Sequence, residues 1–400
     1  MMISKVFNRN FLLLFLCQGL FLTNNVTFVA INGLVGLQLA PLGWMATLPI
    51  AAFVAGGAIA SPLVAKHQRL WGRRNTFLLG LLIAFISCGL CALATVLESF
   101  WLLTAATLLA GYFNANASLY RFAAAELVEP SLKEKAISWL LAGGLMGAVI
   151  GPNLASSAKD SMSHPFTGAY LALMVVALLA LVLMSQITFP PLNDPQQVQV
   201  KGRPLREIAK QPGFIIACIA CALSYGIMNL LMAATPIAMA QCQHPFSAAV
   251  WVLEWHVVGM YAPSFFTGDL IKRFGALSIM VVGLLLNFAC VAVALSGIDL
   301  DHFLIALFLL GVGWNFLYIG GTTLATENYR PEEKTTAQSA VDFSVYATMT
   351  LTAFGSGALV TTGGWTAMNL GSLFPLALMG AALVWLKIKQ NKDQALKTLS

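Results

Sequence analysis

Two stretches of this 400-residue chain repeat one pattern half a chain apart. The first reads Glu126-Leu-Val-Glu-Pro130-Ser-Leu-Lys133-Glu-Lys-Ala136-Ile-Ser138, and the second reads Glu327-Asn-Tyr-Arg-Pro331-Glu-Glu-Lys334-Thr-Thr-Ala337-Gln-Ser339. Glu, Pro, Lys, Ala and Ser recur in register, and Asn114 and Asn315 keep the same offset before them. Each copy is a short polar loop between two long apolar segments. The pattern therefore indicates an ancient duplication within a polytopic membrane protein.

The composition excludes a soluble globular protein. Hydrophobic residues make up 58% of the chain and charged residues 10%, whereas soluble domains carry about 25% charged residues. The mean hydropathy is +0.80. A helix needs about 20 mainly apolar residues to cross a bilayer. We therefore predict an all-α membrane protein with twelve transmembrane helices, at residues 10–33, 43–65, 74–96, 100–125, 136–158, 166–188, 213–239, 246–270, 276–297, 302–326, 336–361 and 365–388.

The basic residues indicate how these helices are oriented. All of the 22 Lys and Arg residues except Lys159 and Arg121 fall in the termini and loops of one side, and positive charge stays on the cytoplasmic side during insertion. We therefore predict cytoplasmic N- and C-termini in a bacterial-type inner membrane. The net charge of +6 then reflects topology and not nucleic-acid binding.

The longest polar segment divides the chain into two pseudo-symmetric parts. We predict a six-helix bundle at 1–189, a cytoplasmic linker at 190–212 with a short helix at 205–209, and a second six-helix bundle at 213–400.

Two loops carry a glycine-and-arginine signature. Between the eighth and ninth predicted helices the chain reads Gly268-Asp269-Leu270-Ile271-Lys272-Arg273-Phe274-Gly275. Between the second and third it keeps Trp71-Gly72-Arg73-Arg74 but lacks the aspartate. With twelve spans and two similar halves, these motifs resemble the major facilitator superfamily. The stretches 120–126 and 139–152 are similar to a bacterial branch of it that includes vitamin (riboflavin-type) uptake carriers.

The fifth predicted helix carries a second motif of the family. Gly143, Gly147 and Gly151 are similar to the glycine motif of the family's proton antiporters. The same spacing also lets another helix pack closely, so both interpretations stay open.

The resemblance implies a monomeric secondary active transporter that moves a small organic solute by alternating access. The sequence has no phosphate-binding loop, hydrolytic triad or metal-ligand pattern, so we expect no enzyme activity, cofactor or metal, and we expect a proton gradient as the energy source. Vitamin- or siderophore-like uptake is slightly favoured over proton-antiport efflux of drugs or metabolites. A receptor or scaffold that kept the fold without transport is the alternative from another class.

One acidic residue lies near the middle of the eighth predicted helix. A charge at the bilayer centre costs about 2.5–3.5 kcal/mol on insertion scales, so such residues are usually functional. We predict that Glu254, with His256 two residues further on, loads and releases the coupling proton. The alternative is a neutral acid that hydrogen-bonds to a neighbouring helix.

One basic residue lies within the fourth predicted helix. Arg121 shares a helix face with Asn114 and Ser118, because residues three and four positions apart point the same way. We predict that it contacts the substrate, which favours an anionic substrate. Alternatively, the long Arg121 side chain extends to the membrane interface or pairs with Glu126 or Asp342.

Polar residues gather on the first, fourth, seventh and tenth predicted helices, which surround the transport path in the family that the chain resembles. We predict that the substrate binds to Arg121, Asn114, Ser118, Asn24, Asn25, Tyr225, Asn229, Trp314, Asn315 and Tyr318. Polar side chains also hold membrane helices together, so each asparagine keeps that alternative.

A further set of charged residues lies at the predicted cytoplasmic helix ends. We predict that they form gating salt bridges, which hold an outward-open state and break when the carrier opens inward. The simpler alternative for the basic members is topology alone. The set comprises Arg73, Arg74, Asp269, Arg273, Glu126, Glu327 and Asp342.

Overall fold

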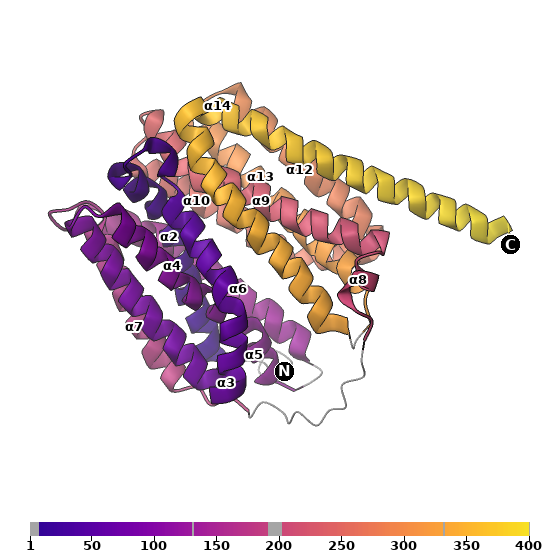
Figure 1. Ribbon diagram of the computed structural model, residues 1–400, viewed down its shortest axis with the longest axis horizontal. Coiled ribbons are helices and arrows are strands. Elements are labelled where there is room, and N and C mark those ends of the chain that lie inside the picture. The colour runs from indigo at the N-terminus through magenta and orange to yellow at the C-terminus, as the bar shows by residue number, and fades with distance from the viewer. Residues whose placement is uncertain (1–7, 130–131, 191–201, 331–332, 400) are drawn as a thin grey trace.

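The computed structural model describes residues 8–129, 132–190, 202–330 and 333–399, and most of these residues are helical (Figure 1). The first half contains α2 (Arg9–Leu39), η1 (Gly43–Met45), α3 (Leu48–Val96), α4 (Phe100–Ala117), α5 (Tyr120–Glu126), α6 (Lys133–Ala158) and α7 (Thr167–Ser185). The second half contains α8 (Leu205–Ile208), α9 (Pro212–Gln241), α10 (Phe246–Tyr261), α11 (Ser264–Phe274), α12 (Ala276–Ser296), α13 (Leu300–Thr326) and α14 (Lys334–Leu399). The described residues form no strand, so the predicted all-α class is confirmed.

Nine helical segments of the described chain are long and apolar enough to cross a membrane. The predicted fourth and eighth spans are each divided, into α4 with α5 and into α10 with α11, and Pro263 caps the start of α11. Conversely, α14 contains the eleventh and twelfth predicted spans. The count of twelve spans and the cytoplasmic termini therefore stay predictions.

Two glycines let the chain reverse its direction between two predicted spans that are joined in one continuous helical segment. Gly72 in α3 has φ 74°, and Gly364 in α14 has φ 70°. This left-handed region carries no steric cost for glycine but does for other residues. The Gly-Arg signature therefore begins at the residue that turns the chain.

The glycine stripe of α6 lies against α2. A Cβ on Gly147 would lie 2.4 Å from the backbone nitrogen of Thr23, and one on Gly143 would lie 2.8 Å from the ring of Phe15. Only glycine allows the two helices to approach this closely. Close packing thus accounts for the stripe.

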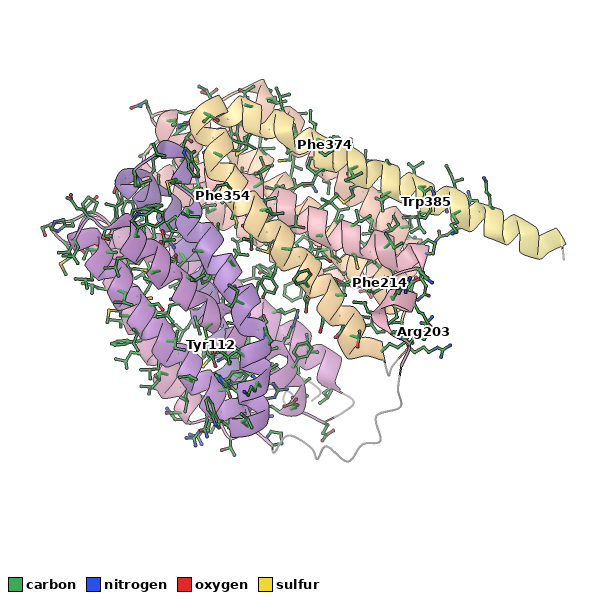
Figure 2. All side chains as sticks on the ribbon, viewed as in Figure 1. Tyr112, Arg203, Phe214, Phe354, Phe374 and Trp385 are labelled. Atoms are coloured by element: carbon green, nitrogen blue, oxygen red, sulfur yellow. The ribbon has the colours of Figure 1, made fainter. Side chains whose placement is uncertain are left out.

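The first and second halves form two adjacent helical bundles, and α8 lies at one end of the second bundle (Figure 1). We call this end the linker end and the opposite one the far end. Large apolar side chains cover the outside of the molecule (Figure 2), including Phe374, which is 77% exposed, and Trp385. Exposed apolar residues of this kind suit a lipid environment and not water.

The halves touch each other at the far end. Thr47 Oγ1, beside η1, donates a hydrogen bond of 2.5 Å to Ala353 O and accepts one of 2.9 Å from Gly357 N. Nearby, the rings of Phe166 and Phe246 pack edge to face with centroids 5.5 Å apart. Hydrogen bonds and ring contacts therefore join the two halves away from the linker.

Candidate functional site

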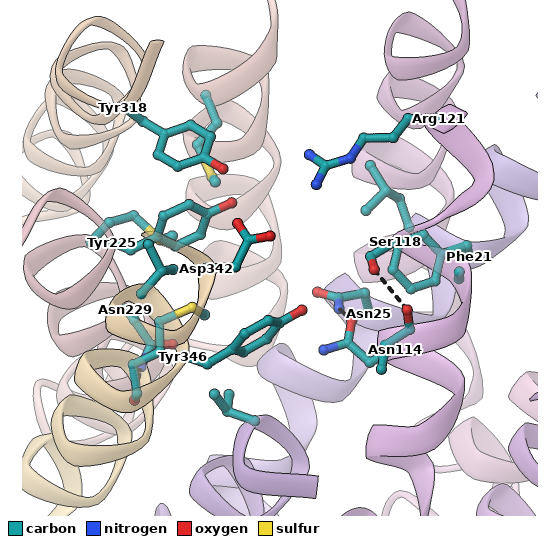
Figure 3. A pocket seen from close by; sticks show the side chains of 18 of the residues that line it. Phe21, Asn25, Asn114, Ser118, Arg121, Tyr225, Asn229, Tyr318, Asp342 and Tyr346 are labelled. Carbon is teal, nitrogen blue, oxygen red and sulfur yellow. Dashed lines mark hydrogen bonds between the residues drawn. The ribbon is translucent and has the colours of Figure 1, made fainter. Parts of the chain in front are cut away.

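A cavity of about 680 Å³ lies between the two halves (Figure 3). It extends from Ile50 and Phe53, near the far end, to Ala65, Phe122 and Phe343, near the linker end. The ring of Phe343 is 73% exposed at this second rim. Ile50 and Phe53 are buried, with exposed fractions of 2% and 4%, so the cavity is closed at the far end and accessible from the linker end.

The first half supplies a polar wall to this cavity. Asn25 of α2 and Asn114 of α4 are joined by a hydrogen bond of 3.2 Å from Asn25 Nδ2 to Asn114 Oδ1. Ser118 follows α4 and also lines the cavity, and its hydroxyl donates to Ala115 O at 2.7 Å.

Arg121 extends from α5 across the cavity toward the second half (Figure 3). None of the ion pairs formed by the described residues includes it, and its Nε is buried without a hydrogen-bond partner. Its guanidinium carbon lies 4.9 Å from the ring centroid of Phe122. The predicted face of Asn114, Ser118 and Arg121 does line the cavity, although α4 ends between them.

The second half supplies an aromatic wall. The rings of Trp314 and Tyr318 on α13 stack with centroids 5.3 Å apart and planes 9° apart. Tyr225 of α9 packs edge to face against both, with centroid distances of 4.9 and 4.8 Å. Among the described polar atoms, Trp314 Nε1 is buried without a hydrogen-bond partner. The three rings form one continuous apolar surface with hydroxyl groups at its edge.

Asp342 faces Arg121 from the second half (Figure 3). The sequence predicts a gating role for it, because it lies near a predicted cytoplasmic helix end. The structure places its carboxylate in the cavity, beside Tyr346, without an ion pair to Arg121 within 4.0 Å among the described residues. The signal that finds Asp342 is its position within a predicted span, where a charge is usually functional.

Three predicted substrate-binding asparagines have their amides engaged elsewhere. Asn24 is buried outside the cavity lining, and its Nδ2 lies 3.6 Å from Cys88 Sγ. Asn229 borders the cavity but donates to Met349 O at 3.0 Å. Asn315 also borders it but is only 1% exposed. Its amide hydrogen-bonds to Met260 O, Ser264 Oγ and Thr267 Oγ1, each at 2.7 Å.

Glu254 and His256 lie outside the residues that line the cavity. Glu254 is half-buried on α10 and accepts a hydrogen bond from Asn153 Nδ2 of α6, so it joins the two halves. His256 points the other way, is fully buried, and bonds through Nδ1 to Leu307 O at 2.7 Å. The two side chains are thus separated, as their spacing of two residues on a helix requires. Their predicted roles stay predictions.

The predicted gating charges are only partly brought together. Arg73 binds Glu126 through two hydrogen bonds of 2.6 and 2.5 Å, and Arg74 donates to Ser185 O. Both contacts stay within the first half. Asp269, Arg273 and Glu327 form no ion pair with any described residue. A lock between the halves at the linker end is therefore not part of this conformation, as far as the described residues extend.

An ion pair that no sequence motif indicates joins the linker to the second half. Glu333 is 1% exposed and accepts hydrogen bonds from Arg203 Nε at 2.6 Å, Arg203 Nη2 at 2.8 Å and the backbone nitrogens of Arg203 and Arg330. These bonds lower the pKa of Glu333 to about 2, and the bond from the Arg203 side chain contributes most.

Among the described residues, no three His, Cys, Asp or Glu side chains gather closely enough to hold a metal ion.

Comparisons with known proteins agree with this architecture. The chain is 36% identical to the riboflavin transporter RfnT of Brucella anthropi over 95% of this chain and 96% of that one. It superposes on the POT family transporter PepTSo with a TM-score of 0.73 at 13% identity, covering 97% of this chain and 98% of that one. For the nucleoside transporter NupG the TM-score is 0.72 at 13% identity, with 95% and 99% covered. These two likenesses concern the fold alone. The sequence profile of the Major Facilitator Superfamily matches residues 11–253 and 217–399, and the chain belongs to this family of membrane transporters.

Proposed function

We propose that the protein takes up riboflavin, or a closely similar flavin, across a bacterial-type inner membrane by proton-driven alternating access. The proposal combines the full-length similarity to a riboflavin transporter with the chemistry of the cavity. Riboflavin is a neutral molecule with a planar, largely apolar ring system and a flexible chain of hydroxyl groups. A suitable site therefore needs a flat aromatic surface and a separate set of hydrogen-bonding groups.

The observation that carries the proposal is the division of the cavity into an aromatic wall and a polar wall. Tyr225, Trp314 and Tyr318 offer surfaces for the flavin ring, since aromatic rings attract one another in stacked and edge-to-face arrangements. Asn114 and Ser118 on the opposite side can bond to the hydroxyl chain. The volume of about 680 Å³ also lies in the range of ~300–1000 Å³ that is usual for small-molecule sites.

Alternating access is supported by the way the two halves meet. The Thr47 hydrogen bonds and the Phe166–Phe246 contact close the far end, while Phe122 and Phe343 border the open rim. With the predicted orientation, the linker end is cytoplasmic and this conformation is inward-open. The outward-open state then requires the far-end contacts to separate.

Proton coupling is assigned to Glu254, the carboxylate on α10 that accepts a bond from Asn153 across the two halves. Protonation removes the charge that makes such a bond strong, so proton loading weakens a contact between the moving parts. This gives the carboxylate a way to link its protonation to the relative position of the halves.

Efflux by proton antiport is the second transport mechanism to test. Its main support, the glycine stripe of α6, is explained by the contacts of Gly143 and Gly147 with α2. Uptake is therefore preferred. A scaffold without transport is distinguished by the absence of any solute flux.

The test uses the purified protein in vesicles with an imposed proton gradient and labelled riboflavin. We expect accumulation that depends on the gradient and is blocked by excess unlabelled flavin, while other vitamins, siderophores and dyes compete poorly. Equal transport of unrelated compounds, or no flux at all, would contradict the proposal.

Reporter fusions after Ser400, in the linker and near Lys159 test the orientation of the protein in the membrane. We expect a cytoplasmic signal from the first two fusions and not from the third.

A further inference from the structure

We infer that Asp342 makes the cavity select neutral riboflavin over its phosphate monoester, by balancing the charge of Arg121. This inference rests on the proposed function. It names the residue that determines which chemical form of the flavin is bound.

The charge inventory of the cavity is the first observation. Of the described residues that line it, Arg121 is the only basic one and Asp342 the only acidic one, so the formal charges cancel. The two side chains extend from opposite walls toward the same space (Figure 3). The remaining lining is apolar or carries neutral amides and hydroxyls, which supply no further charge.

The position of Arg121 alone would indicate an anion site. Its Nε is buried without a hydrogen-bond partner in the described structure, and a guanidinium suits carboxylates and phosphates. The sequence favours an anionic substrate because Arg121 shares a helix face with Asn114 and Ser118. Asp342 changes the conclusion, because an added anion would meet a carboxylate as well as the cation.

The cost of adding a phosphate follows from the surroundings. A phosphate monoester carries about −1.5 to −2 charges at neutral pH, so the occupied cavity would hold a net negative charge. Uncompensated charge is poorly tolerated between largely apolar walls, where the effective dielectric constant is below that of bulk water. Riboflavin leaves the balance between Arg121 and Asp342 unchanged, and its hydroxyls can bond to either group.

The inference predicts a change of selectivity when Asp342 loses its charge. Asp342→Asn keeps the size and hydrogen-bonding capacity but leaves Arg121 as an uncompensated cation. We expect the wild type to bind the ester at least about tenfold more weakly than riboflavin. In Asp342→Asn, the affinity for the ester relative to that for riboflavin should rise at least about tenfold over the wild type. One factor of ten in affinity corresponds to about 1.4 kcal/mol.

The experiment is an equilibrium titration of the purified full chain with riboflavin and with its phosphate monoester, followed by flavin fluorescence. Asp160→Asn is the matched control, because it removes one exposed carboxylate outside the cavity. The double variant Arg121→Gln with Asp342→Asn restores the charge balance and should lose the gain for the ester. Asp342→Ser replaces Asp342→Asn if the latter does not fold, with the same expectation.

The outcomes separate the two proposals. Wild-type protein that binds riboflavin, with an Asp342 variant whose preference between the two ligands is unchanged, overturns the inference and leaves the proposed function in place. An equal gain for the ester in Asp160→Asn also overturns it. Wild-type protein that fails to bind riboflavin overturns the proposed function and this inference with it.

Discussion

The two halves of the molecule place equivalent positions on the same cavity but give them different chemistry. In the register of the repeated loops, Ser118 of the first half corresponds to Ile319 of the second, and Leu141 corresponds to Asp342. All four line the cavity. At these two pairs of positions both halves contribute to the cavity lining, while the residue type at each position sets the chemistry of the wall. A polar wall and an aromatic wall arise from one architecture.

The paired asparagines show the same divergence. Asn114 lines the cavity, with a single bond to Asn25, whereas its counterpart Asn315 is buried and bonded to three groups on α10 and α11. One faces the cavity, and the other bonds α13 to its neighbours. An identical residue at an identical offset therefore does not have an identical role.

The largest expected effect tests whether coupling resides in the second half alone. Glu254 lies on α10, whereas α3 of the first half contains no Asp or Glu. Glu254→Gln keeps the size and hydrogen bonding but cannot titrate near neutral pH. We expect gradient-driven accumulation to be abolished while riboflavin binding and exchange stay near the wild-type level. The uptake of labelled substrate into vesicles measures gradient-driven accumulation, and counterflow without a gradient measures exchange.

Two results would count against this prediction. Wild-type accumulation by Glu254→Gln would make the Asn153–Glu254 bond structural. Asn153→Ala is the companion variant, since it removes the partner but keeps the titrating group. It should also lower accumulation, because the contact between the halves that protonation weakens is gone. Accumulation at the wild-type level in Asn153→Ala would mean that the proton does not act through this bond.

The second prediction compares Arg121 with its counterpart Thr322, which lies outside the cavity lining. Arg121→Ala should weaken substrate binding by roughly 10- to 100-fold, because hydrogen bonds to charged groups contribute about 1.5–3 kcal/mol. Arg121→Lys should lose part of the affinity, because it keeps the charge without the planar fork. Thr322→Ala should bind normally. A binding titration on protein of normal yield measures all three.

The structural alternative for Arg121 predicts another pattern. If Arg121 serves mainly to neutralise Asp342, Arg121→Ala lowers yield and melting temperature, and adding Asp342→Asn restores them, because an uncompensated buried charge has been removed. Normal affinity in a well-folded Arg121→Ala protein ends the substrate-contact interpretation.

The fold could be predicted from the sequence because its main determinants are local. Apolar segment length and the repeated loops indicated the all-α class, which is confirmed. The division of the fourth and eighth spans depends on a few residues such as Pro263, which hydropathy averages out. Gly72 and Gly364 turn the chain so tightly that no loop separates the two spans on either side, which are joined as α3 and as α14.

The site could be predicted only where the helix itself sets the geometry. The face shared by Asn114, Ser118 and Arg121 follows from helical spacing, and it lines the cavity. Which asparagines are engaged by neighbouring helices depends on tertiary contacts that spacing does not contain. Glu333 was missed because a charged loop looks solvent-exposed, and its partner Arg203 lies 130 residues away.

The third prediction separates the two asparagines. Asn315→Ala removes three hydrogen bonds and leaves Ser264 and Thr267 without this buried partner, so we expect a loss of roughly 1–3 kcal/mol in the free energy of unfolding. Asn114→Ala should leave the melting temperature nearly unchanged and weaken substrate binding. Thermal melting and binding titration of both variants provide the check. Equal destabilisation by both substitutions would mean that Asn114 is structural too.

The smallest effect concerns the repeated loops, where Glu333 of the second half corresponds to Leu132 of the first. Leu132 is buried among apolar residues, whereas Glu333 is buried with Arg203. We expect Glu333→Gln to lower the melting temperature, because it removes the charge that Arg203 pairs with. Glu207→Gln, at an exposed position of the same linker, is the matched control and should have a much smaller effect, since Glu207 acts on Arg203 only at a distance.

The pH dependence identifies the charge as the cause. The pKa of Glu333 falls from its ordinary value of 4.5 to about 2 on folding. A lowered pKa means that the stabilisation is complete above the ordinary value and is lost as the pH falls toward the folded one. The difference in melting temperature between wild type and Glu333→Gln should therefore be constant above pH 4.5 and shrink below it. A difference that persists unchanged into the acid range would show that packing, and not the ion pair with Arg203, distinguishes this loop from its counterpart in the first half.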